Sequence, residues 1–269
     1  MDDLWPPAAY KFNLMPDIFD FLTVNKLWDP VGDCFIVLPH SVMEAGVRSW
    51  LNMLSWFIGK KYGLKRTRPW SDRNCNQAPD SADILRKPDL VLLDRTILTG
   101  PLRNPSENTT WPMVLAFAEV TSLAVAPRRI PDTVNNKSYL MFLKQEDRQF
   151  VPALSFDRSG NFSLTITDQQ GQIIMPIMPC WAGKGPVFIF LKLLTILMFS
   201  DKFYLSLDPT MERLPNAGAI YHIRCDGKWY NVHSQIYHIQ LIVGRGTAVW
   251  IVYNNEGYFI LKDSWVQLS

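Results

Sequence analysis

The most apolar run of the sequence, VFIFLKLLTILMF at 187–199, constrains the fold most strongly. It carries one charge, Lys192, and is much shorter than the roughly 20 residues that a membrane-spanning helix needs. A helix that is apolar on all sides has to be buried. We therefore expect a helix inside a protein core, in a chain whose 48% hydrophobic and 13% aromatic residues can fill that core.

Periodic patterns before this run predict a mixed α/β order. Residues 36–60 predict an amphipathic helix, because apolar side chains recur three or four positions apart. These side chains are Met43, Val47, Leu51, Leu54 and Phe57. Apolar runs at 88–94 and 111–125 predict strands, and a helix candidate at 134–148 leads into a predicted β-hairpin at 149–168.

The segment beyond residue 210 predicts short strands separated by turns. Its apolar stretches are punctuated by CDGK and NNEG, which are typical turn sequences. The fold class we expect is α/β, of the α+β kind. A nuclease-like mixed-sheet domain at 1–205 is followed by a β-rich module at 206–269 that corresponds to part of a kinase small lobe.

Two carboxylates mark the predicted strands at 88–94 and 111–125. Asp89 opens the first strand in KPDLVLLD, and Glu119 lies in AEVT on the next. This arrangement resembles that of the PD-(D/E)-x-K nucleases, which implies two carboxylates that hold Mg²⁺ or Mn²⁺ and a lysine that activates water. Glu44, on the predicted first helix, is a candidate third metal ligand.

The nuclease pattern is incomplete, because Thr121 stands where the lysine belongs. A neutral hydroxyl does not supply the positive charge that stabilises a developing phosphate transition state. Lys137 on the next predicted helix, or Lys87, are candidates to supply that charge. Two acids on neighbouring strands are also typical of solvated or paired surface residues. The sequence leaves two alternatives: a metal-dependent nuclease, or a nuclease-like fold that has no nuclease activity.

A glycine-rich stretch near the C-terminus has the spacing of a nucleotide-binding loop. In GRGTAVWI, Gly244 and Gly246 stand two apart, Val249 takes the place of a third glycine, and Ile251 follows. Lys262 ends FILK, as the lysine that contacts phosphates ends the V-A-I-K strand of kinases. An ordinary β-hairpin with a tight glycine turn would show the same residues.

The sequence around these residues resembles that of the fungal-type protein kinase family. GRGTAVWIV followed by GYFILKDSW is similar to the start of that family's kinase domain. Upstream, KPDLVLLD, WPMVLAFAEV, RQFVPALSFDRSGNFSL and LDPT resemble the family's N-terminal region in the same order. The resemblance covers roughly residues 80–269 and implies that Gly244, Gly246 and Lys262 contact ATP.

The H-R-D and D-F-G motifs of a kinase are missing from this sequence. They supply the aspartate that accepts the substrate proton and the residues that hold magnesium. We therefore expect a non-catalytic binding or regulatory fragment of a fungal-type protein kinase, not an enzyme. The alternatives are a metal-dependent nuclease that uses Asp89 and Glu119, and a pseudokinase fragment that binds ATP.

The net charge and the cysteine content limit which binding partners and which cellular compartment we expect. A net charge of +2 does not favour nucleic acid as a partner. A kinase lobe cut after its third strand exposes an apolar face and an edge, so we expect a protein partner or self-association at the β-rich end. Four dispersed cysteines and an acidic, proline-broken start without a signal peptide indicate an intracellular protein, cytoplasmic or nuclear, without a membrane partner.

Overall fold

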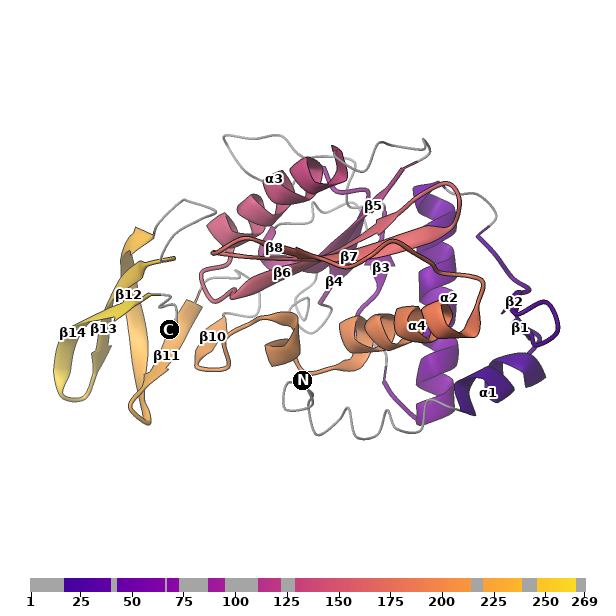
Figure 1. The fold of residues 1–269 in the computed structure, drawn as a ribbon. Helices are drawn as coiled ribbons and strands as arrows, with labels where there is room; N and C mark the ends of the chain where they lie inside the picture. The colour runs from indigo at the N-terminus through magenta and orange to yellow at the C-terminus, as the bar shows by residue number, and fades with distance from the viewer. Residues whose placement is uncertain are drawn as a thin grey trace.

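The computed structural model describes residues 17–39, 43–65, 67–72, 87–94, 111–121, 129–213, 220–238 and 246–264, with only the backbone at 129–132 and 220. Within these ranges the chain forms four α-helices and three sheets, of two, five and seven strands (Figure 1). The α+β class predicted from the sequence is confirmed.

The seven-stranded sheet is mixed and forms the centre of the larger part of the molecule. Six of its strands follow in chain order: β3 (Trp70–Ser71), β4 (Leu90–Leu93), β5 (Val114–Val120), β6 (Phe150–Phe156), β7 (Asn161–Asp168) and β8 (Gln172–Ile174). The seventh, β9 (Met178–Pro179), also pairs with β7. Strands β5 and β6 are parallel, and α3 (Arg129–Lys144) is the crossover that parallel neighbours require.

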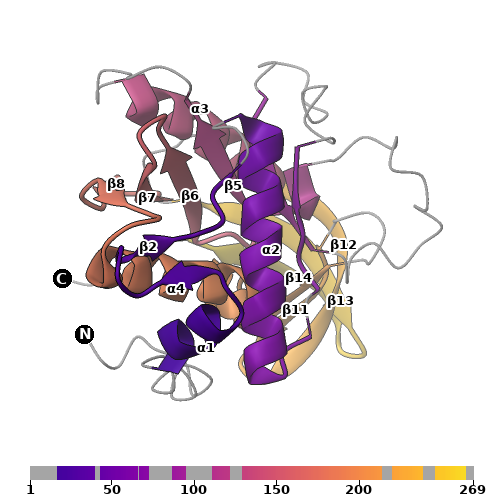
Figure 2. The same ribbon diagram turned by 90° about the vertical axis from the view of Figure 1, so that its right-hand side faces the viewer.

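Helices cover both faces of this sheet. Helix α3 packs on one face, and α4 (Lys184–Phe199) on the other, where α1 (Ile18–Val24), α2 (Glu44–Tyr62) and the short pair β1 (Trp28–Asp29) and β2 (Cys34–Phe35) complete the core (Figures 1 and 2). Side chains alternate between the two cores along β4, with Leu90 and Leu92 in one and Val91 and Leu93 in the other.

The apolar run at 187–199 is the buried helix that its composition predicts. It forms α4, and the ring of Phe190 stacks on Trp50 of α2 with centroids 5.2 Å apart. No helix in the described ranges combines the length and the apolar content needed to cross a membrane.

The predicted amphipathic helix is α2, and its apolar pattern begins where the sequence places it, at Met43. The helix starts at Glu44, with Met43 as an N-cap residue that forms no side-chain cap hydrogen bond. Within the segment 36–60, residues 36–39 lie before the helix and contain exposed apolar side chains.

The predicted hairpin at 149–168 is confirmed as β6 and β7. The carboxylate of Asp157 accepts hydrogen bonds from the backbone N–H groups of Ser159, at 2.8 Å, and Asn161, at 2.9 Å. Gly160 has a φ of +79°, and Trp181 lies where its Cβ would be, so the turn requires glycine.

The five-stranded sheet is an antiparallel meander in the C-terminal part of the chain. Its strands are β10 (Met211–Arg213), β11 (Ile220–Cys225), β12 (Lys228–His238), β13 (Ala248–Asn254) and β14 (Gly257–Asp263), paired in that order. Its small core consists of Met211, Ile223, Ala248, Trp250 and Val252. The CDGK turn is confirmed, with positive φ at Asp226 and Gly227.

A buried arginine connects the central strands to the chain that leads into this second sheet. Arg148, 2% exposed, donates to the backbone oxygens of Val114 (3.0 Å) and Leu115 (3.1 Å) on β5. It also donates to the carbonyl of Leu205, at 2.9 Å, in the 3-10 helix η5 (Lys202–Leu205), and to the side chain of Gln145. Burial lowers the pKa of Arg148 to about 9.

Replacing Arg148 tests this connection. Arg148→Met removes the arginine donor from the buried carbonyls of Leu115 and Leu205 and one of two side-chain donors from that of Val114, so we expect the free energy of unfolding in urea to fall by about 3 kcal/mol or more. Arg158→Met, at an exposed position in the β6–β7 turn, is the matched control and should change it by less than about 0.5 kcal/mol. Equal stability of the two variants would contradict the role given to Arg148.

Candidate functional site

Asp89 and Glu119 lie next to each other at one end of the β4–β5 pair. Leu90 pairs with Ala118 in antiparallel register, which puts the two acids beside each other. The backbone N–H of Val120 donates to Asp89 Oδ2 at 2.8 Å. Val91 and Phe117, two residues away on each strand, belong to the core beneath α3, so the two acids are on the α3 side of the sheet.

Helix α3 brings Lys137 to this pair of acids. Val134 and Met141, one turn away on either side, are fully buried, and Lys137 shares their face of the helix. Its side chain is 4% exposed and forms an ion pair with Glu119 Oε1, whose side chain is 12% exposed. Of the two lysines that the sequence offers as candidates for this charge, Lys137 is the one whose ion pair with a carboxylate of the site the structure shows.

The other predicted members of the site lie at its margin. The backbone N–H of Thr121 donates to the carbonyl of Phe156 at 2.9 Å, so Thr121 continues the strand pairing. Lys87 is exposed, and its charge opposes the rise that burial causes in the pKa of Asp89. Glu44, the first residue of α2, acts on Asp89 in the opposite direction, which places its charge within electrostatic reach.

Burial has the largest effect on the pKa values of the two acids. It raises the pKa of Glu119 to about 7, although Lys137 opposes this shift, and the charge of Asp89 adds to it. Burial also raises the pKa of Asp89, against the hydrogen bond from Val120. Glu119 can therefore exchange a proton near neutral pH, beside the carboxylate of Asp89.

The candidate metal site is sparse in ligands. Across the described part of the chain, no group of three or more His, Cys, Asp or Glu residues could hold a metal ion. Magnesium, however, is commonly held by one or two carboxylates with water or phosphate completing its shell. Asp89 and Glu119, two carboxylates side by side on neighbouring strands, fit this minimal pattern.

Of the predicted nucleotide-binding residues, Lys262 lies on the other sheet, and Gly246 lies two residues before its strand β13. Gly244 falls outside the described residues. Gly246 has a φ of 46°, a conformation that favours glycine. Ile251 pairs with Ile260, and Lys262, two residues further along β14, is on the same face. Lys262 is exposed, and it forms no ion pair with any residue that the structure describes.

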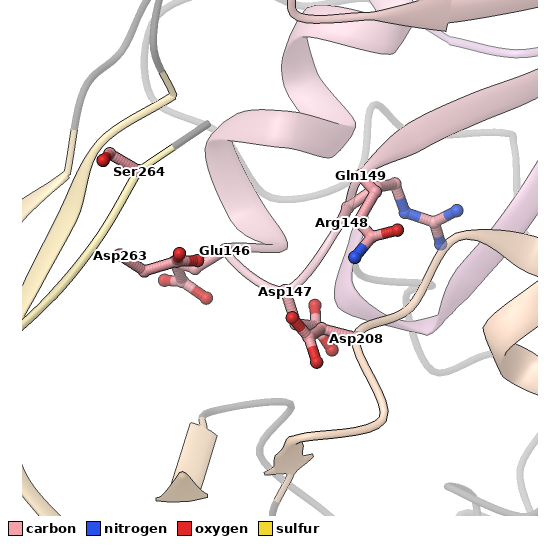
Figure 3. A pocket seen from close by; sticks show the side chains of 7 residues that line it. All are labelled: Glu146, Asp147, Arg148, Gln149, Asp208, Asp263 and Ser264. Carbon is pink, nitrogen blue, oxygen red and sulfur yellow. The ribbon is translucent and has the colours of Figure 1, made fainter. Parts of the chain in front are cut away.

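A pocket of about 200 Å³ lies where the two larger sheets approach each other (Figure 3). Its lining residues are Glu146, Asp147, Arg148, Gln149, Asp208, Asp263 and Ser264. Burial, and secondarily the charge of Asp208, raise the pKa of Asp263. Asp147 is neutralised by an ion pair with Arg213. The sequence gives no sign of this pocket, because its residues come from three separated segments with no shared motif.

Comparison with protein families decides the relationship. The sequence model described as fungal protein kinase matches residues 87–269, which is more than half of the chain. The chain belongs to the fungal protein kinase family. The family resemblance drawn from GRGT, FILK and KDSW is confirmed, and the matched span includes Asp89, Glu119, Lys137 and Lys262 but not Glu44. No curated protein and no solved structure matches the chain.

The raised pKa of Glu119 predicts a pH dependence of stability. The folded chain binds this proton more tightly than the unfolded chain, so stability from Glu119 is present below its unfolded pKa, near 4.5, and is lost as pH rises to about 7. Urea unfolding between pH 4.5 and 8 should show this decline, and Glu119→Gln should flatten it.

Asp20→Asn, which removes an exposed carboxylate from α1, is the control for that experiment. An unchanged slope in Glu119→Gln, or the same flattening in both variants, would contradict the assignment.

Proposed function

We propose that this member of the fungal protein kinase family acts as a non-catalytic binding and regulatory region, with the β10–β14 sheet as its binding surface. The observation that carries the proposal is the set of aromatic and aliphatic side chains that this sheet exposes. Lys262, the lysine of the kinase resemblance, is also exposed, on β14.

The sequence supports the same conclusion. Phosphoryl transfer depends on an aspartate that accepts the proton of the substrate hydroxyl and on side chains that hold magnesium at the phosphates. The 269 residues contain neither an H-R-D nor a D-F-G motif to provide them. These residues by themselves have no route for phosphoryl transfer.

The sheet has the surface character of a binding site. Its described residues include exposed aromatic and aliphatic side chains at Trp229, Ile236, Tyr237, Tyr253, Tyr258, Phe259 and Ile260. Exposed apolar residues that gather on one element commonly mark protein interaction sites. Tyrosine and tryptophan are also enriched at such interfaces.

Nucleotide binding separates this proposal from the ATP-binding alternative. We expect no transfer of labelled phosphate from Mg-ATP to the chain or to a general protein substrate, and no rise in melting temperature with Mg-ATP. A nucleotide-dependent rise that is lost in Lys262→Ala but kept in Lys228→Ala, on strand β12 of the same sheet, would establish the pseudokinase instead. Phosphoryl transfer by the purified chain would refute the proposal outright.

A metal-dependent nuclease is the second candidate, and the contact of Lys137 with Glu119 favours it. Asp89 and Glu119 are the residues that would hold Mg²⁺ or Mn²⁺, and the ion would supply Lewis-acid stabilisation of a phosphate. Lys137 would add a fixed positive charge at the same place, the role for which Thr121 lacks the chemistry.

Cleavage assays test this second candidate. If the site is a nuclease, Mn²⁺-dependent cleavage of DNA or RNA should fall at least 100-fold in Asp89→Asn and in Lys137→Met. Lys144→Met, in the last turn of the same helix, should retain activity. Calorimetric titration with Mn²⁺ supplies an independent readout, since binding should be lost in Asp89→Asn. The absence of both cleavage and Mn²⁺ binding in the parent chain would exclude the nuclease.

A further inference from the structure

A buried serine hydroxyl lies next to the Asp89–Glu119 pair without a hydrogen-bond partner. Ser155 of β6 is 5% exposed, and its Oγ forms no hydrogen bond with any residue that the structure describes. Glu119 and Ser155 are register partners on the parallel strands β5 and β6. Neighbouring strands are about 4.8 Å apart, so the serine is the immediate neighbour of Glu119 in the sheet.

Ser155 is on the same side of the sheet as the candidate site. Leu154 and Phe156, its neighbours on β6, belong to the core on the side of α4. Because side chains alternate along a strand, Ser155 is on the α3 side, as Asp89 and Glu119 are. Three oxygen-bearing side chains on consecutive strands therefore form one row beneath the helix that carries Lys137.

Lys137 also has unused donors at this place. An ammonium group carries three N–H donors. Among the residues that the structure describes, Glu119 Oε1 is the one acceptor that forms a hydrogen bond with Lys137, whose side chain is 4% exposed. Buried donors without acceptors cost free energy, and native proteins rarely retain them unless a bound molecule or a functional role accounts for them. The site thus presents a cation and a hydroxyl, both with unused donors, beside two carboxylates.

We propose that Lys137 and Ser155 bind an oxyanion of the phosphate class beside Asp89 and Glu119. A phosphate group has several oxygens that accept hydrogen bonds from donors on different elements, and lysine is a common phosphate ligand. Magnesium held by one or two carboxylates commonly completes its shell with phosphate oxygens. The two acids would hold the metal, and Lys137 and Ser155 would donate to the phosphate. The inference rests on the second candidate function and adds Ser155 to that site as a residue that contacts the ligand.

A second buried serine provides a matched control. Ser163 is the register partner of Ser155 on the adjacent strand β7 and is 8% exposed. Its Oγ donates to the carbonyl of Met175 at 2.7 Å. The protein itself therefore satisfies the hydroxyl of Ser163, whereas the described residues leave that of Ser155 without a partner.

The melting temperature of the unliganded chain separates the two serines. Ser155→Ala removes a hydroxyl that has no partner among the described residues, so the melting temperature should stay the same or rise. Ser163→Ala removes the donor of the Met175 carbonyl and should lower it. A clear loss of stability in Ser155→Ala would show that its hydroxyl bonds within the protein, and would overturn the inference.

Binding measurements in Mg²⁺ test the ligand with two probes, inorganic phosphate by calorimetry and a labelled DNA oligonucleotide by fluorescence anisotropy. Ser155→Ala should weaken the binding of the probe that the parent chain binds by about ten-fold. The affinity for Mn²⁺ alone should change by less than about two-fold, because the serine contacts the oxyanion and not the metal. Ser163→Ala should change neither affinity.

The two probes also identify the source of the phosphate. Binding of inorganic phosphate indicates a small phosphate compound, and binding of the oligonucleotide alone indicates a nucleic-acid backbone. No binding of either probe, or equal binding by the parent chain and Ser155→Ala, would overturn the inference. Metal-dependent cleavage that is unchanged in Ser155→Ala would leave the nuclease standing without it. Serine-dependent binding without cleavage would keep the inference and exclude the nuclease, so the two failures are distinguishable.

Discussion

The structure depends on one buried cation, the guanidinium of Arg148. It lies at the start of β6 and satisfies carbonyl oxygens of β5 and of the 3-10 helix η5. A planar group with five donors can do this, and an ammonium group cannot. The next residue toward the N-terminus, Asp147, holds Arg213 of β10. Two consecutive residues after α3 therefore position both the parallel strand pair and the first strand of the second sheet.

The candidate site follows from the same crossover. Because β5 and β6 are parallel, α3 must cross the face of the sheet that carries Asp89 and Glu119. Lys137 is on the buried side of that helix and reaches Glu119, in a position where solvent screens the pair weakly. The residues that resemble a nuclease site and the residues that resemble a kinase site lie in different parts of the structure. The carboxylate and lysine group belongs to the mixed sheet, and Lys262 belongs to the edge of the β10–β14 sheet.

Much of this could be predicted from the sequence, where local pattern and tertiary environment agree. The α4 helix, the β6–β7 hairpin and the β-rich end follow from apolar periodicity and turn residues such as Gly160. The apolar pattern of α2 also follows from the sequence, from Met43 onward. The ion pair of Lys137 with Glu119 and the acidic pocket depend on helix placement and on segments far apart in the chain, and local patterns do not encode such distances.

Hydrogen–deuterium exchange of β13 and β14 tests the central claim most directly, that the C-terminal sheet is a binding surface and not a nucleotide cradle. The account predicts that saturating Mg-ATP leaves the exchange of the backbone amides at 246–263 unchanged. Protection of these amides that appears with Mg-ATP would contradict it.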